Sequence, residues 1–342
     1  MATPPPVPFG LTPPLTVNNE LNHNGVITVI ASFSLFLVLS SLGIRVYSAY
    51  SRKSRQLDDL TFAVTVVLAL GQISAVFVQI HFGWGKSKWL IADVNVHSIE
   101  KAGYSADLLY IAVIFSSKAS TALFYRTLTP RGSLWMNYAL LLLTLLCAPV
   151  GIVLLAVRCG RPPWHDVSKQ CSAVFPHWQA VTALDIIFEI ILSLYPTWAI
   201  LRLQMTPSNK VIVILVLSCR VFLVPVGAIH LHCMSQQVNS PDPTLEGTFP
   251  TIVAELHVAL SVLVLITPLI KPFVAAYVDE HGLAYTDDPS KSRTSHKATV
   301  YPDRSSTTYP GSRIHDPPAK KSLMKRIEIS VDRENVELME RR

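Results

Sequence analysis

Long apolar runs alternate with short polar segments along the first 280 residues of the chain. A helix of about 20 apolar residues crosses a hydrocarbon core about 30 Å thick. Buried strands are usually four to eight residues long, so runs of this length predict helices. Seven runs qualify: Gly25–Gly43, Leu60–Ile80, Leu108–Phe124, Trp135–Val157, Ala180–Leu201, Val211–Leu231 and Thr251–Ile270. The pattern predicts an all-α membrane protein, a bundle of seven transmembrane helices.

Composition and charge support the same class and give an orientation. Hydrophobic residues make up 50% of the chain and charged residues 15%, against about 25% charged in soluble domains. Basic residues near the ends of spans are retained in the cytoplasm. The short first, third and fifth connections carry Arg45, Arg52, Lys53, Arg55, Arg126, Arg131, Arg202 and Lys210. We therefore expect the N-terminus outside, and a basic inner surface facing anionic lipid rather than nucleic acid.

The two ends of the chain differ from the apolar region at 25–280. Residues 1–24 are rich in proline and have no Lys or Arg, so they lack the basic start of a signal peptide and predict an extracellular segment. Residues 281–342 are too polar to offset their ordering entropy, which predicts a disordered cytoplasmic tail. Hydroxyl residues near its basic residues are candidates for phosphorylation; an unregulated solvated tail is the alternative.

Two cysteines fall in one predicted outer loop. Cys159 and Cys171 would both face an oxidising compartment, where a disulfide would staple the loop over the bundle. Two free thiols, or competition from Cys233 in the next outer loop, remain alternatives. No spacing suggests a zinc site.

Five charged residues lie inside the apolar runs. At 1.5 Å per residue, Lys118, Glu189 and Arg220 lie about 14–15 Å from the ends of their spans, near the midplane. Asp185 and Glu255 lie about 6–8 Å below the outer surface. A charge at the bilayer centre costs at least about 2.5–3.5 kcal/mol, so these residues should face the interior and pair. We expect a network lining a polar cavity open to the outside; an ion cluster that only fixes helix packing is the alternative.

Several segments, in order, resemble the fungal rhodopsin-domain family, seven-span proteins described as fungal receptors of the G-protein-coupled type. The similar segments are "LDDLTF", "LLYIAVIFSSKASTALFYR", "CGRPPW" with the later Cys171, "ALDIIFEIILSLYPTWAILRLQM" followed by Lys210, and "AELHVALSVLVLITPLIKP". The resemblance covers roughly residues 25 to 280. The chain departs from the family at Arg220, where relatives usually have a small residue, and at His230, where they tend to have a basic one.

The resemblance implies a receptor-like surface sensor in the plasma membrane, with an unknown extracellular ligand. A G-protein α subunit would read its inner face, where Asp58, Asp59, Tyr125 and Arg126 are candidate switch residues. Simpler interpretations remain for Asp58 and Asp59, which complement a helix dipole, and for Arg126, which can anchor a span. The last span has no lysine for retinal, because Lys271 stands at its inner end, and we expect no cofactor.

Two other functions are open at this point. Some fungal seven-span proteins cyclise terpenes with intramembrane carboxylic acids, a role that Asp185, Glu189 and Glu255 could take. Lys118 and Arg220 would instead favour ionised carboxylates, so we expect no enzyme. A small-molecule transporter is compatible with charged midplane residues, but the sequence shows no pair of related halves.

Overall fold

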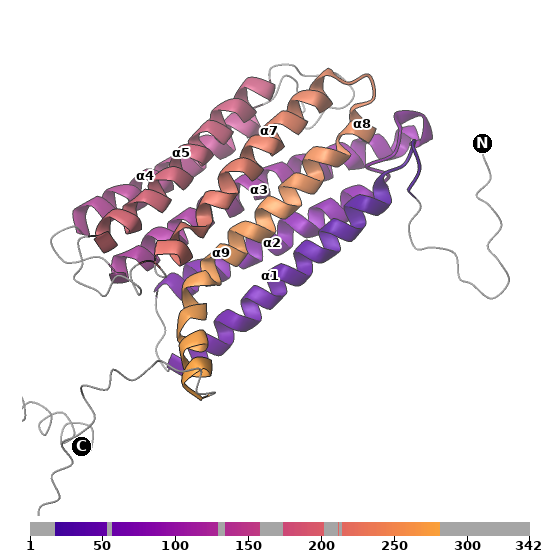
Figure 1. The fold of residues 1–342 in the computed structure, drawn as a ribbon. Coiled ribbons are helices and arrows are strands. Elements are labelled where there is room, and N and C mark those ends of the chain that lie inside the picture. The colour runs from indigo at the N-terminus through magenta and orange to yellow at the C-terminus, as the bar shows by residue number, and fades with distance from the viewer. Residues whose placement is uncertain are drawn as a thin grey trace, which may run out of the picture. The chain divides into compact units, whose positions relative to one another are not determined.

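The computed structural model describes residues 18–52, 57–128, 134–157, 174–201, 211 and 214–280, and the regular elements of this part are all helices. Seven of the helices that it describes are long and apolar enough to cross a membrane. The chain is therefore a multi-pass membrane protein with a seven-helix bundle (Figure 1). Its elements are α1 (Asn24–Arg52), α2 (Leu57–His81), η1 (Lys88–Leu90), α3 (Asp93–Leu128), α4 (Leu134–Ala156), α5 (Val174–Leu201), η3 (Ser218–Phe222), α7 (Leu223–Asn239), α8 (Pro243–Glu246) and α9 (Thr248–Glu280).

Some predictions lie outside the described residues. They concern residues 1–17 of the N-terminal segment, the pair Cys159 and Cys171, and the tail at 281–342. Cys233 is described and is a free thiol.

Helix α3 is the central helix of the bundle. It packs against α2, α4, α5 and α9, and it passes behind the front helices in Figure 1. In its most apolar stretch 67% of the residues are buried, compared with 22% in α4. Polar side chains in the middle of α3 are therefore surrounded by protein.

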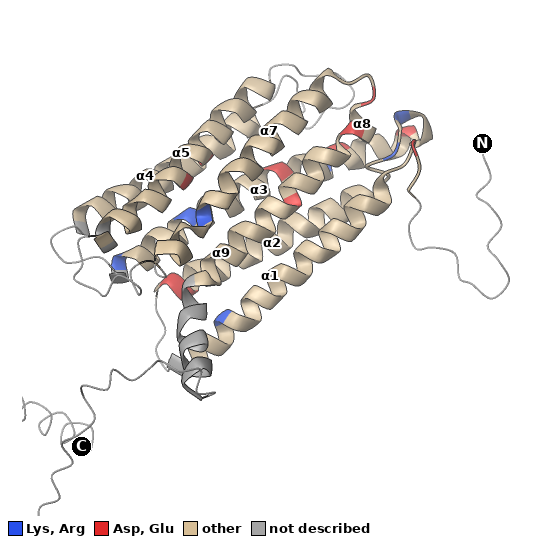
Figure 2. Cartoon of the chain, in the orientation of Figure 1, with Lys and Arg blue, Asp and Glu red and all other residues tan. Residues whose placement is uncertain are grey.

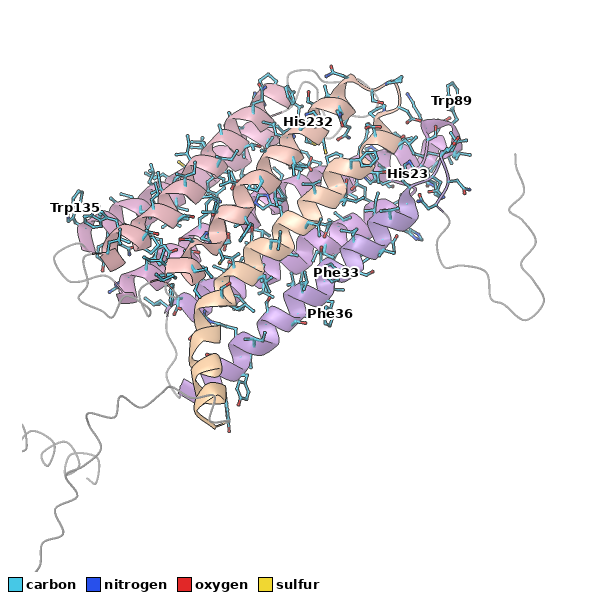
Figure 3. The ribbon with its side chains drawn as sticks, viewed as in Figure 1. His23, Phe33, Phe36, Trp89, Trp135 and His232 are labelled. Carbon is cyan, nitrogen blue, oxygen red and sulfur yellow. The ribbon has the colours of Figure 1, made fainter. Side chains whose placement is uncertain are left out.

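The outer faces of the helices are apolar and exposed. Phe33 and Phe36 of α1 are 50% and 64% exposed and point away from the bundle (Figure 3). Apolar surface on this scale is rare in soluble monomers, whereas in a bilayer it contacts lipid. Trp89 and Trp135 are exposed at opposite ends of the bundle (Figure 3), as is typical of aromatic residues at the two membrane interfaces.

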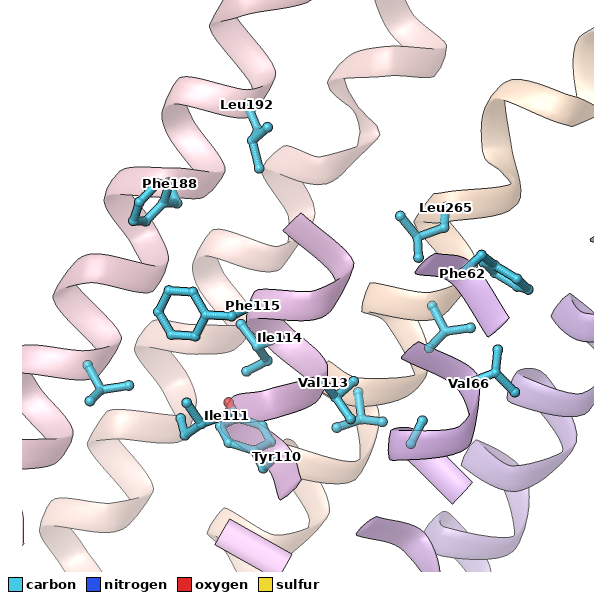
Figure 4. Packing of buried hydrophobic residues seen from close by; sticks show 14 of the residues in the cluster. Phe62, Val66, Tyr110, Ile111, Val113, Ile114, Phe115, Phe188, Leu192 and Leu265 are labelled. Carbon is cyan, nitrogen blue, oxygen red and sulfur yellow. The ribbon is translucent and has the colours of Figure 1, made fainter. Parts of the chain in front are cut away.

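Apolar packing on both sides of α3 fixes its depth relative to its neighbours. Phe115 of α3 meets Phe188 of α5 edge to face, with ring centroids 6.2 Å apart (Figure 4). Phe62 of α2 and Leu265 of α9 belong to the same buried cluster. Such close-packed contacts resist sliding of one helix along another.

Helix α3 begins well before the predicted run. The run starts at Leu108, whereas the helix starts at Asp93. Hydropathy detects only the stretch that must be apolar in hydrocarbon, but helical hydrogen bonding satisfies the backbone beyond it as well. The added turns carry Glu100 and Asp107, which line a cavity described below.

The sixth span is irregular around Arg220. The 3-10 segment Ser218–Phe222 contains Arg220 and precedes α7. Pro225 lies in the first turn of α7, where its missing N–H leaves no hydrogen bond unmade. Pro149 and Pro196, by contrast, lie inside α4 and α5.

Loops close the bundle at the end where α1 begins, which we call the amino-terminal end. Asp242 accepts hydrogen bonds from the Ser87 hydroxyl and, at 3.2 Å, from the backbone N–H of Lys88, which joins the α2–α3 loop to the α7–α8 connection. Partial burial raises the pKa of Asp242, but hydrogen bonds from Ser87 and Thr244 outweigh this effect and hold that pKa below its usual value.

A glycine turn at the same end lets α1 approach α2. Gly85 has a φ of 85°, and a Cβ there would lie 3.1 Å from the backbone nitrogen of Asn24, so a side chain would be both strained and crowded. The Asn24 amide donates to the carbonyl oxygens of Ile80 and Trp84 at 2.9 and 3.1 Å. These contacts fix Trp84 above the space between the helices.

Candidate functional site

Four charged side chains meet in the middle of the bundle, where charged positions are otherwise few (Figure 2). The Lys118 ammonium of α3 donates to Asp185 Oδ1 and to Glu189 Oε1, both at 2.6 Å. Asp185 and Glu189 are four residues apart on α5 and therefore share one helix face. Lys118 and Glu189 are both fully buried.

Arg220 adds a second cation from η3. Its Nε and Nη2 donate to the two carboxylate oxygens of Glu189 at 2.8 and 2.9 Å, and Nη1 donates to the Thr121 hydroxyl. This two-pronged geometry is the strong form of an arginine–carboxylate pair. Lys118, Asp185, Glu189 and Arg220 are called the central cluster below.

The central cluster is balanced in charge, with two cations and two carboxylates. Burying ions is costly, and the cost is offset only where geometry is good and other hydrogen bonds complete the set. Both Glu189 oxygens have cationic donors, and the Arg220 fork has a third acceptor in Thr121. The equal depth of Lys118, Glu189 and Arg220 in the sequence is thus matched by direct contact in space.

Glu255, the fifth residue, has different partners from those expected. Its Oε1 accepts a hydrogen bond from the Gln72 amide of α2 at 3.0 Å, and its backbone carbonyl accepts one from Ser34 of α1. No described residue donates to its Oε2. Helix α9 packs against α1, and Glu255 lies on the face that this contact covers.

His257 takes the place that sequence reasoning gave to Glu255. Two residues along α9 is about 200° of rotation, which turns His257 toward α3 and α5. Its Nε2 lies 4.0 Å from Asp185 Oδ2, and its Nδ1 hydrogen-bonds the Tyr110 hydroxyl at 2.8 Å. Sequence reasoning missed both residues because neither carries a permanent charge; their available signal was a polar side chain within an apolar run.

A cavity of about 150 Å³ opens among the helices toward the amino-terminal end. Trp84 and Gln79 lie near its mouth, and Gln72, Tyr110, Trp178 and His230 form its deeper wall. His230 lies against the rings of Tyr110 and Trp178, with centroids 5.1 and 5.2 Å away.

The position of this cavity differs from the expectation. Of the described residues, its lining includes none of the four members of the central cluster and not Glu255. Lys118 follows Tyr110 by eight residues on α3, which places it about 12 Å deeper. The rings of Tyr110, Trp178 and His230 pack against one another at the cavity wall. The Tyr110–His257 hydrogen bond leads from that wall toward Asp185.

The expected inner residues lie at the opposite end of the bundle. Arg45 of α1 is buried and bonds Asp58 at 2.5 Å and Asp59 at 2.7 Å, while its guanidinium lies 5.3 Å from the ring centroid of Phe62. From the sequence, Arg45 is expected only to be a basic loop residue. Its burial makes it the residue that orders Asp58 and Asp59.

The other two inner candidates differ in burial. Tyr125 is buried and packs against Tyr195 at 6.0 Å between ring centroids. Arg126 is exposed, with its guanidinium 5.4 Å from the ring centroid of Tyr138. Arg126 is thus available at the surface of this end of the bundle, whereas Tyr125 belongs to the packing beneath it.

A second, smaller cavity separates the central cluster from the Arg45 pairs. It measures about 20 Å³, and Arg220, Thr121, Tyr125, Arg45 and Asp58 are among its lining residues. A water molecule needs about 10–15 Å³ measured this way. The space therefore accommodates one water between Arg220 and the Arg45–Asp58 pair.

Comparison with known proteins places this arrangement in a family. Curated proteins give no match to the chain. A family model described as the fungal rhodopsin domain matches residues 44–276, a range that contains the central cluster, the cavity-lining residues and both carboxylates paired with Arg45. The chain belongs to the fungal rhodopsin domain family.

Proposed function

We propose that this protein is a surface sensor in the plasma membrane, with the amino-terminal end of the bundle outside. The observation that carries the proposal is a line of polar contacts between the two ends. From the large cavity it runs through Tyr110, His257, Asp185, Lys118, Glu189, Arg220 and Thr121 to the small cavity at Arg45 and Asp58. The step from His257 to Asp185 is a 4.0 Å approach, and the other steps between side chains are hydrogen bonds.

A ligand in the large cavity would act through Tyr110. The side chain lines the cavity and bonds His257, so a ligand that shifts the ring changes the contact between His257 and Asp185. A ligand shifts an equilibrium only by its differential affinity for two states. The two states would differ at the 3-10 segment around Arg220, because such segments within helices often mark hinges.

The inner end of the bundle would pass the conformational change caused by the ligand to a G-protein α subunit. Arg126 is exposed there, and a change at Arg220 alters the small cavity shared with Arg45 and Asp58. In this proposal Asp58, Asp59, Tyr125 and Arg126 are the switch residues. We assign no catalytic role to Asp185 or Glu189, because cations hold both.

Transport is the second candidate, and the same line of contacts favours it. A chain of titratable groups with room for water can pass a proton. Reconstituted protein that moves protons down a pH gradient, with loss of flux in Glu189→Gln, would support this function instead of sensing.

The test of the sensor is energy transfer between the chain and a G-protein α subunit in living cells. Inputs are a panel of lipids, nutrients and host extracts. Glu189→Gln keeps the shape of the side chain but removes the charge that pairs with Lys118 and Arg220. We expect an input-dependent change in the native chain that falls at least about tenfold in the variant.

Ile190→Val is the matched control, since Ile190 neighbours Glu189 but is 44% exposed toward the membrane. It should respond like the native chain. A full response from surface-expressed Glu189→Gln would contradict the role of the central cluster. A native chain that is silent to every input, beside an active transport assay, would favour the second candidate.

A further inference from the structure

We propose that the large cavity binds a small organic cation, a ligand with a protonated amine beside an apolar or aromatic group. The inference deepens the proposed function and rests on the cavity being its ligand site. Three features of the described residues carry it: an unmatched buried carboxylate, unpaired polar atoms in the cavity wall, and an aromatic lining.

The unmatched carboxylate is Glu255. The central cluster balances its own charges, so the fifth intramembrane charge has no opposite partner among the described residues. Glu255 is fully buried, its Oε1 accepts from a neutral amide, and its Oε2 has no described donor. An isolated charge in such a place is costly unless another charge neutralises it.

Gln72 connects Glu255 to the cavity. The side chain is 2% exposed and lines the cavity. Because its Nε2 donates to the carboxylate of Glu255, its Oε1 is oriented as an acceptor, and no described group donates to that oxygen. A buried acceptor left unpaired is costly, so an ammonium group that donates to it removes a penalty of the empty site.

The remaining wall suits the rest of such a ligand. Trp84, Trp178 and Tyr110 line the cavity, and aromatic faces attract cations. Trp178 Nε1 is buried without a described acceptor, which suits a ligand that also carries a hydroxyl or carbonyl oxygen. The described lining includes the carboxylates Glu100 and Asp107 and no Lys or Arg. Its volume of about 150 Å³ is that of cavities known to admit benzene.

The experiment compares two probes that differ in charge. Benzylamine is protonated at neutral pH; benzyl alcohol has nearly the same size and also donates a hydrogen bond, but it is neutral. Binding of each to the full-length protein in detergent micelles is measured by titration calorimetry. We expect benzylamine to bind at least about tenfold more tightly, since a charged donor strengthens the hydrogen bond and meets the carboxylate behind it.

Two variants and one control assign the effect. Glu255→Gln removes the charge with little change of shape and should abolish the preference for benzylamine. Gln72→Leu removes the acceptor and should weaken benzylamine binding about tenfold, which provides a test if Glu255→Gln fails to fold. Glu20→Gln makes the same chemical change at an exposed position and should leave the preference unchanged.

Three outcomes would overturn the proposal. They are equal affinity for both probes, as expected if a bound proton already neutralises Glu255; absence of binding by either probe; and variants that behave like the native chain, meaning a preference for benzylamine that survives in a folded Glu255→Gln variant or a benzylamine affinity that is unchanged in a folded Gln72→Leu variant. None of them depends on signalling, because the titration uses purified protein. A failed titration beside an intact energy-transfer response would leave the sensor standing, and the reverse pair of results would leave the cation site standing.

Discussion

At the scale of single residues, the central cluster shows how a lysine is kept in the middle of an apolar helix bundle. Lys118 is fully buried and bonds two carboxylates at 2.6 Å, one of which also receives the Arg220 fork. Each ion is thereby neutralised by its neighbours. Removing one member leaves the others as buried, uncompensated charges. This destabilises a protein more than replacing the whole pair with apolar residues does.

Lys118→Met is therefore expected to destabilise the protein strongly. Loss of one partner from a buried ion pair costs about 3–5 kcal/mol, and here two carboxylates lose a donor. The measurement is the melting temperature in detergent micelles. Adding Asp185→Asn to Lys118→Met should restore part of the loss, because it removes one orphaned charge.

Lys88→Met, at an exposed position in η1, is the control and should melt near the native temperature. Equal melting of Lys118→Met and Lys88→Met would mean that the central cluster adds nothing to stability. The cluster would then have to be explained by function alone.

At the scale of elements, the apolar runs predict where helices cross the membrane but not which way each side chain faces. The seven expected spans correspond to seven helices, because length and hydropathy suffice for that. Glu255 and His257 show the limit. Both are polar and two residues apart on α9, and only the packing of α9 against α1 decides that Glu255 turns toward Gln72 and His257 toward Asp185.

The sequence pattern also does not predict the roles of Tyr110, Trp178 and Arg45, for a similar reason. Tyr110 and Trp178 look like ordinary apolar residues of their runs, yet they form the wall between the large cavity and the central cluster. Arg45 looks like a loop charge, yet it is buried between Asp58 and Asp59. Contacts between distant segments are set by helix packing, which a single sequence does not reveal.

The connection between the loops at the amino-terminal end gives a prediction for pH dependence. Asp242 has a pKa below its usual value in the folded protein. Such a carboxyl makes its full contribution to the stability of the folded state at pH values above its pKa in the unfolded chain, about 3.9. The contribution is lost as the pH falls through the lower pKa that the group has in the folded protein. Melting temperatures should therefore fall more steeply below about pH 4 in the native chain than in Asp242→Asn.

Asp93→Asn, at an exposed aspartate in the first turn of α3, should follow the native profile. Parallel profiles of Asp242→Asn and the native chain would show that the bonds to Ser87 and Lys88 do not stabilise the closed loops. The proposed sensor function would be unaffected, since the central cluster is held by the helices.

At the scale of the whole molecule, orientation decides what the two cavities can meet. The large cavity opens toward the amino-terminal end and the small one lies near Arg45 and Asp58 at the other. Basic residues of the first, third and fifth connections should hold the second end in the cytoplasm. With that orientation the large cavity faces the outside, where the proposed ligand would arrive, and the exposed Arg126 faces the cytoplasm, where the proposed G-protein partner would bind.

An epitope placed before residue 18 should therefore be stained by antibody on intact cells, while one at the C-terminus should be stained only after permeabilisation. Staining of both in permeabilised cells controls for expression, and an antibody to a cytosolic protein controls for leakage. The reverse pattern would turn the large cavity toward the cytoplasm. The unmatched Glu255 would then pair with an intracellular cation. A receptor for intracellular metabolites, or a transporter, would replace the surface sensor as the proposed function.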